Sequence, residues 1–172
     1  ELLLQRREGR RKPSLRIWSA GCASGAEPYS IAITLLENKH RLQDWTLRIV
    51  GTDISEEVLG AAREGAFPSR AVEAVSEKQL RRFFQHRPSD DRWCVRPEVK
   101  QMVEFRHHNL MQPLGEASFD CVFIRNVLIY FDRDSKRTVI KHLLGALRQG
   151  GYLVVGPSEG IYDMLGDLNK IS

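Results

Sequence analysis

The stretch Ile17 to Ser30, "IWSAGCASGAEPYS", decides the fold class, because it passes from an apolar run through two glycines to a proline and an apolar periodic segment. Leu15 to Ala20 predicts a buried strand, and Pro28 to Asn38 predicts a helix with proline in its first turn. A strand, a glycine-containing turn and a helix in this order are typical of an α/β sheet that binds a ligand beyond the carboxyl ends of its strands.

The rest of the chain repeats this alternation of strand and helix. Ser55 is expected to cap a helix that Gly65 ends, and Asp134 to cap a helix that Gly150 ends. Four further strands are predicted at Leu47 to Asp53 and at "VEFRHHNL" (103–110), "FDCVFIRN" (119–126) and "GYLVVG" (151–156). We therefore predict an α/β fold with a doubly wound, mainly parallel sheet that is covered on both faces.

The segment from Pro68 to Lys100 interrupts the alternation. It contains a short helical pattern, Ser76 to Phe84, and strand patterns around a turn, so we expect a small antiparallel insertion at about 68–102. Residues 1–14 are predicted to be a linker or the end of a missing N-terminal helical domain. Residues 15–172 are then the main domain, without the last strand that usually completes such a sheet.

Composition narrows the class of protein further. The chain has 172 residues, 42% of them hydrophobic, and a net charge of +4, which fits one domain with one sizeable core. It has neither an apolar stretch of about 18 residues nor a secretory signal, so a cytoplasmic location is expected. The three cysteines are widely separated, and His107 and His108 would point to opposite faces of a strand, so no metal site is predicted.

The opening motif discriminates between ligands. Its spacing is Gly-x-x-x-Gly, which lacks the pyrophosphate-binding Gly-x-Gly-x-x-Gly pattern, and no Gly-Lys-Ser/Thr follows. Asp53 ends the second predicted strand, where a carboxylate can accept both hydroxyls of a ribose. Glu27 would repel a pyrophosphate but suits a ligand with an ammonium and a sulfonium, which favours a cationic nucleoside. Alternatively, Glu27 only complements the positive end of its helix.

Five segments together resemble, in order and spacing, the CheR-type chemotaxis receptor methyltransferases. They are "IWSAGCASGAEPYSIAI", "GTDISEEVLGAAREGAF", "VEFRHHNL", "FDCVFIRNVLIYFD" and "GGYLVVGPSEG", spread over residues 15–160. The resemblance implies a Rossmann-like class I methyltransferase domain that uses S-adenosylmethionine and releases S-adenosylhomocysteine. It implies methyl transfer to glutamate side chains of methyl-accepting chemoreceptors.

The resemblance also implies roles for ten residues. The expected cofactor-binding residues are Cys22, Ala23, Ser24 and Glu27 in the first loop, Asp53 at the ribose, Asn109 and Leu110 at the adenine edge, and Arg125 and Asn126 beside the methionine portion. Tyr130, near the transferring methyl group, and Arg125 are the expected catalytic residues.

Three of these residues have structural alternatives. Asn109 can cap a turn before Leu110, and Tyr130 can be a core aromatic residue. Arg125 can pair with an acid such as Asp120 or Asp132.

The partner is expected to be a chemoreceptor or a related sensory protein, without membrane insertion. A nucleic acid is not expected, because "RNVLIY" stands where amine-methylating enzymes carry an Asn/Asp-Pro-Pro-aromatic motif. A binding module without turnover is a further alternative, since Ala26 and Pro157 depart from the family pattern. The insertion segment "QHRPSDDRWC" contains no glycine, so we expect no binding of a C-terminal pentapeptide tether.

Overall fold

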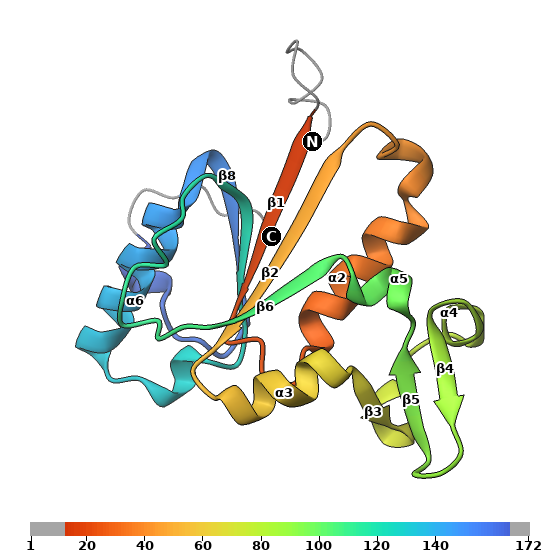
Figure 1. Ribbon diagram of the computed structural model, residues 1–172. Helices are drawn as coiled ribbons and strands as arrows, with labels where there is room; N and C mark the ends of the chain where they lie inside the picture. Colours follow the sequence, from red (N-terminus) through yellow and green to blue (C-terminus); the bar gives the residue numbers. More distant parts are fainter. Residues whose placement is uncertain (1–12, 166–172) are drawn as a thin grey trace.

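The computed structural model describes residues 13–165, and its centre is a sheet of five parallel strands (Figure 1). The strand order is β6-β2-β1-β7-β8, so β1 lies in the middle. The strands are β1 (Ser14–Ala20), β2 (Thr46–Asp53), β6 (Val103–His107), β7 (Phe119–Ile124) and β8 (Leu147–Val155). The predictions for residues 1–12 and for the end of the chain beyond residue 165 lie outside the described residues.

Helices lie on both faces of this sheet, as Figure 1 shows. On one face, α2 (Ala26–Glu37) packs with a core that includes Ile17 and Ile49, and α3 (Glu56–Glu64) lies against β2 and β6. On the other, the apolar stripe of α6 (Arg133–Ala146) packs with Trp18 and its neighbours. The predicted doubly wound, mainly parallel fold is therefore confirmed.

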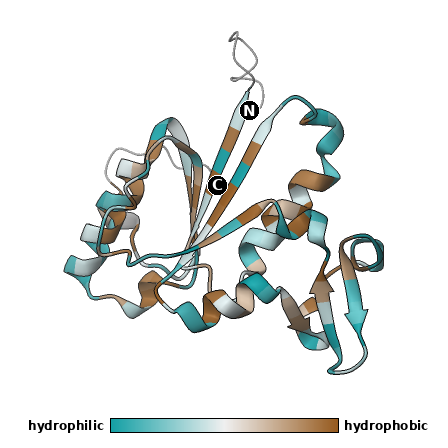
Figure 2. Cartoon of the chain, viewed as in Figure 1, coloured by the Kyte–Doolittle hydropathy of each residue, from teal (hydrophilic) through white to brown (hydrophobic). Residues whose placement is uncertain are grey.

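The alternation of side chains along β1 explains how the sheet is buried. In Figure 2, hydrophobic and hydrophilic residues alternate along β1 and β2. Trp18 is fully buried, paired in register with Val50 on one side and Val122 on the other. Its indole N–H donates to the hydroxyl of Thr52 at 2.9 Å, which satisfies the one polar atom that this ring buries.

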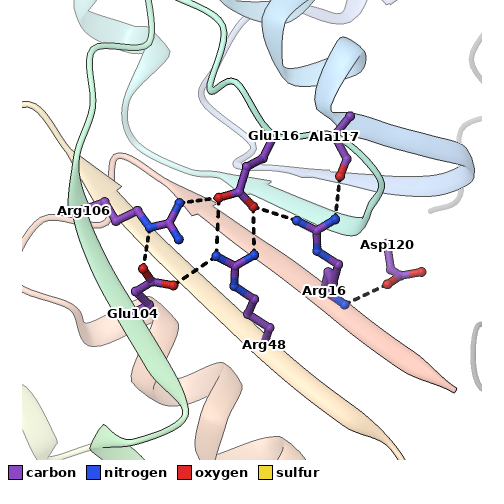
Figure 3. A network of polar contacts seen from close by, with 7 residues as sticks. All are labelled: Arg16, Arg48, Glu104, Arg106, Glu116, Ala117 and Asp120. Carbon is purple, nitrogen blue, oxygen red and sulfur yellow. Dashed lines mark hydrogen bonds and ion pairs between the residues drawn. The ribbon is translucent and has the colours of Figure 1, made fainter. Parts of the chain in front are cut away.

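Residues 108–118 join β6 to β7 without a helix. On the face of the sheet that carries α6, this connection is held by ion pairs instead of helix packing. Glu116 in this connection contacts the guanidinium groups of Arg16, Arg48 and Arg106, which project from three adjacent strands (Figure 3). The Arg16 contact is 2.7 Å and the Arg48 contact 2.9 Å. Glu116 thus fastens this connection to the sheet.

A second, antiparallel sheet lies beyond α2 and α3, on the side away from α6 (Figure 1). Its strand order is β3-β5-β4, with β3 (Ala66–Pro68), β4 (Phe84–Arg87) and β5 (Arg92–Val95). The expected small antiparallel sheet is present. The segment expected to turn between strands after β5 forms a short helix instead, because Pro97 suits its first position. The short elements outside the two sheets, this helix (α5) included, are η1 (Lys39–Arg41), η2 (Ser69–Val72), α4 (Glu77–Phe83), α5 (Pro97–Lys100), η3 (Leu128–Tyr130) and η4 (Tyr162–Met164).

The predicted helix ends are partly right. Ser55 caps α3 by accepting a hydrogen bond from the Val58 N–H, and Gly65 ends it in the left-handed conformation, as predicted. The prediction that Asp134 caps α6 is wrong, because the Asp132 side chain accepts from the N–H groups of residues 134 and 135. The helix also ends at Ala146, before Gly150, because residue 147 already pairs with β7.

Candidate cofactor site at the carboxyl ends of the strands

The loop after β1 is shaped by two glycines in the left-handed conformation. Gly21 has φ +72°, and a Cβ on it would lie 2.5 Å from Cγ2 of Val127. Gly25 has φ +85° and precedes α2, with the ring of Phe105 3.0 Å from the place of a Cβ. A Cβ at either position would therefore collide with a neighbouring side chain. Ala23, between them, has φ +45°.

Glu27 lies in the first turn of α2 and turns toward the sheet. Its Oε1 accepts a hydrogen bond from the Ser19 hydroxyl at 2.7 Å, and its Oε2 lies 3.9 Å from Nη1 of Arg125. Burial raises the pKa of the Glu27 carboxyl, while the Ser19 hydrogen bond and the Arg125 charge oppose the rise. The helix-dipole explanation still applies, yet these contacts also direct Glu27 toward Arg125 across the site.

These residues surround a hollow of about 350 Å³, within the usual size range of small-molecule sites. We call it the strand-end hollow. It brings together six of the predicted cofactor-binding residues from the ends of β1 and β7. Its lining residues are Gly21, Cys22, Ala23, Ser24, Ala26, Glu27, Ser30, Arg125 and Asn126.

Asp53 ends β2 and is not itself a lining residue of the strand-end hollow, but it holds Ala23, which is. One carboxylate oxygen accepts from the Ala23 N–H at 2.9 Å, and the other accepts from the Ser55 N–H at 3.0 Å. Each carboxylate oxygen has two lone pairs, so both can still accept a hydroxyl from a ligand. The same carboxylate therefore holds the first loop and offers acceptors beside it.

Cys22 is not a reactive thiol in this arrangement. Burial, with a smaller contribution from the Asp53 charge, raises its pKa to about 12. Its N–H donates to the Thr52 carbonyl oxygen at 2.8 Å, which fixes the loop to the end of β2. The contribution of Cys22 is therefore made by its backbone and its small neutral side chain.

Asn109, Leu110 and Tyr130 do not line the strand-end hollow. The Asn109 side chain accepts from the Met111 N–H at 3.0 Å, so the predicted turn is present there. Leu110 is 8% exposed and packs in the core on the α6 side. Tyr130 is 83% exposed, so its interpretation as a core aromatic residue is wrong.

The alternative partners suggested for Arg125 are also wrong. Asp120 accepts hydrogen bonds from the Arg148 side chain at 2.5 Å and the Arg16 N–H at 2.8 Å. Asp132 caps α6. The acid beside Arg125 is Glu27, so the two charged residues of the strand-end hollow face each other.

Sequence reasoning gave no role to two residues that organise the site. Ser19 supplies the hydroxyl that holds Glu27, and Glu159, 1% exposed, accepts hydrogen bonds from the turn after β7. A serine inside a strand carries no distinctive signal. For Glu159, the only available signal was its place in the "GPSEG" segment.

Residues 13–165 contain neither a cluster of metal-ligating side chains nor a helix that could cross a membrane. No group of three or more His, Cys, Asp or Glu side chains in this part of the chain could hold a metal ion. In the same residues, no helix is both long enough and apolar enough to span a membrane.

The model of the CheR methyltransferase family, SAM-binding domain, matches residues 1–172. The chain belongs to the CheR methyltransferase family. "Chemotaxis protein methyltransferase 1" of Pseudomonas aeruginosa is 40% identical over 156 residues, covering 87% of this chain and 56% of the relative. The "Probable chemotaxis protein methyltransferase" of Rhizobium etli is 37% identical over 164 residues, covering 94% and 60%. The chain thus spans little more than half the length of these CheR relatives.

Solved structures agree with the CheR fold. The glycopeptide N-methyltransferase MtfA complexed with sinefungin has a TM-score of 0.52 at 14% identity, over 81% of this chain and 42% of that one. The DszA carbon methyltransferase has a TM-score of 0.53 at 18% identity, over 88% and 31%. At these identities the likeness shows the fold alone.

The matched CheR domain is the S-adenosylmethionine-binding domain, so S-adenosylmethionine is the cofactor. The donor set of the strand-end hollow fits this group. Asp53 presents acceptors suited to ribose hydroxyls, and Glu27 presents a half-buried carboxylate suited to an ammonium. Gly21 and Gly25 allow the left-handed turns of the loop that carries the lining residues 22–24.

Proposed function

We propose that this chain transfers a methyl group from S-adenosylmethionine to glutamate side chains of methyl-accepting chemoreceptors, in the cytoplasm of a bacterium. Support comes from CheR relatives named as chemotaxis protein methyltransferases. The structural observation that carries the proposal is the pair of carboxylates, Glu27 and Asp53, beside one hollow at the strand ends. S-adenosylhomocysteine is then the second product.

In this proposal the predicted residues bind different parts of the cofactor. Asp53 accepts the ribose hydroxyls while it keeps the Ala23 N–H in place. Glu27 binds the ammonium of the methionine portion, and Arg125 and Asn126 border that portion from the β7 side. Asn109 and Leu110, beyond the strand-end hollow, border the adenine edge with the backbone of their turn.

The proposed chemistry needs few protein groups. The cofactor supplies a methyl group already activated by a sulfonium charge. A glutamate carboxylate has an ordinary pKa of about 4.3, so it is ionised near neutral pH and needs no general base. The chain's own task is positioning, which can lower a barrier by roughly 7 to 11 kcal/mol in favourable cases. In the proposal, Tyr130, which is exposed at the turn after β7, donates a hydrogen bond to the incoming carboxylate.

Calorimetry with S-adenosylmethionine and S-adenosylhomocysteine tests the cofactor part of the proposal. Asp53→Ala should weaken binding by about 10-fold to 100-fold, because hydrogen bonds to a charged group contribute about 1.5–3 kcal/mol. Asp44→Ala is a matched control, since Asp44 is exposed in the turn before the opposite end of β2. Equal binding by wild type and Asp53→Ala would contradict the assignment.

Labelled methyl transfer tests the substrate. The full-length protein is incubated with labelled cofactor and either a receptor signalling domain or tRNA. We expect base-labile label on the receptor domain only, because carboxyl methyl esters hydrolyse in base. Label on tRNA would replace the proposal by nucleic-acid methylation, and binding without any transfer would favour the binding module.

We further propose that the antiparallel sheet contacts the receptor without holding a tail peptide. Its β4–β5 loop has no glycine, and its acids are already paired, Asp90 with Arg87 at 2.6 Å and Asp91 with His86 at 2.8 Å. Titration of receptor C-terminal peptides by calorimetry should give no saturable heat. A micromolar dissociation constant would refute this.

A further inference from the structure

Glu159 is a buried carboxylate that the proposed reaction does not use. It follows β8, is 1% exposed, and accepts hydrogen bonds from the Leu128 N–H at 2.7 Å and the Val127 N–H at 3.3 Å. We propose that Glu159 is a positioning residue, which sets the turn after β7 through these two backbone bonds. In residues 13–165, the Glu159 side chain forms no hydrogen bond with a lining residue of the strand-end hollow or with Tyr130.

The turn that Glu159 holds needs an outside acceptor. Asn126 has φ +59°, the left-handed conformation that asparagine tolerates better than most residues other than glycine. The next two N–H groups stand at the start of η3, where a helix has no internal acceptors. Leaving the buried Leu128 N–H unpaired would cost about 1–3 kcal/mol, and leaving the part-buried Val127 N–H unpaired would cost less. The carboxylate therefore supplies the acceptors that the turn itself lacks.

Glu159 is itself fixed against the end of β7. The Gly156 N–H donates to the Ile124 carbonyl at 3.0 Å, and the Lys136 ammonium donates to the Glu159 carbonyl at 2.8 Å. A Cβ on Gly156 would lie 3.1 Å from Oε1 of Glu159 and 3.3 Å from Cα of Arg125. The segment after β8 thus packs directly on the strand end that leads into the turn.

This arrangement connects two parts of the proposed site. Arg125 and Asn126 line the strand-end hollow, and Tyr130 stands at the far end of the same turn. Because Glu159 holds Val127 and Leu128, two of the three residues between Asn126 and Tyr130, it fixes where Tyr130 lies relative to the strand-end hollow. The link to methyl transfer rests on the proposed function, whereas the effect on the backbone does not.

Hydrogen–deuterium exchange on the full-length protein tests the backbone effect without any substrate. In Glu159→Ala, the amides of Val127 and Leu128 should exchange at least about tenfold faster, the loss of roughly one net hydrogen bond each. Glu159→Gln keeps one acceptor oxygen and should recover part of the protection, mainly at one of the two amides. If Glu159→Ala does not fold, exchange in Glu159→Gln tests the proposal in its place.

Asp120→Asn is the matched control. Asp120 is also fully buried and also accepts from a backbone N–H, that of Arg16 at 2.8 Å, but at the opposite end of β7. The Asp120→Asn variant should have a lower melting temperature, but the amides of Val127 and Leu128 should not exchange faster relative to those of the rest of the sheet. Equal acceleration in both variants, or unchanged exchange in Glu159→Ala, would overturn the proposal.

The consequence for the reaction is measured in single turnover at saturating cofactor. Glu159→Ala should lower the transfer rate constant by about tenfold or more, while cofactor affinity changes less, because misplacement of about 1 Å is enough for such a loss. Glu159→Gln should be intermediate, and Asp120→Asn should stay within about twofold of wild type. A wild type that transfers no methyl group would refute the proposed function, and the exchange result would still decide the role of Glu159.

Discussion

Substitution of Gly21 by alanine tests whether the first loop has the described conformation. The new Cβ would lie 2.5 Å from Cγ2 and 3.1 Å from Cγ1 of Val127, a β-branched side chain with little rotamer freedom. An alanine at φ +72° adds about 1–2 kcal/mol of backbone strain, and relief of the overlap about 1–3 kcal/mol. Restriction of the unfolded chain offsets about 0.4–1 kcal/mol. We expect the free energy of unfolding to fall by about 1–4 kcal/mol.

Urea denaturation measures this loss, and Gly145→Ala is the control. Gly145 is exposed in α6, and nothing lies within 4 Å of its added Cβ. Alanine there should raise stability by about 0.5–1 kcal/mol, because glycine is a poor helix former. If Gly21→Ala were as stable as wild type, the left-handed loop packed on Val127 would be wrong.

A double-mutant cycle separates strain from overlap. Val127→Ala removes the two methyl groups that Gly21→Ala would strike, so in that background Gly21→Ala should cost about 1–2 kcal/mol less than in wild type. The backbone strain remains in both backgrounds. Strict additivity would mean that the two residues are not in contact.

Three further outcomes are expected. Burial raises the pKa of Glu27 in the folded state, so between the unfolded and folded pKa values the folded state binds more protons, and stability falls as the pH rises through that window. Glu27→Gln should therefore stabilise the cofactor-free protein at pH 7.5 but not at pH 3.5. The same substitution should weaken cofactor binding at pH 7.5. Arg148→Ala should cost about 3–5 kcal/mol in urea denaturation, since it leaves the fully buried Asp120 carboxylate without its ion pair. Glu116→Gln should cost only about 1 kcal/mol, and less in 1 M NaCl, because its three arginine partners are part-exposed. An effect of 3 kcal/mol that salt leaves unchanged would contradict the last expectation.

Local signals in the sequence were sufficient for much of the fold. Ser55 and Gly65 were predicted correctly at the two ends of α3, because a cap depends on neighbours three or four residues away. The start of α6 was misplaced because "FDRDS" contains two acids, Asp132 and Asp134, that are both good caps. Its end was misplaced because a pairing with β7, distant in sequence, starts β8 at Leu147.

The candidate site was predictable to the extent that it follows from topology. Parallel strands end at one edge of the sheet, so the ends of β1, β2 and β7 had to place Glu27, Asp53 and Arg125 near one another. The contacts that orient these side chains were not predictable. The bond between Ser19 and Glu27 depends on how a helix is rotated against a strand, and no residue pattern encodes that angle.

On both sides of the strand-end hollow, a carboxylate accepts hydrogen bonds from two backbone N–H groups. Asp53 accepts from two N–H groups in the loops around β1 and β2, and Glu159 accepts from two N–H groups after β7. Each carboxylate is distant in sequence from at least one of its donors. Each also orders a stretch of backbone with a non-glycine residue at positive φ, which is Ala23 beside Asp53 and Asn126 beside Glu159. Asp53 is also proposed to bind the ribose, so its removal weakens the loop and the ligand contact together. Glu159 performs the first task alone, which is why its variants can separate loop order from cofactor affinity and Asp53 variants cannot.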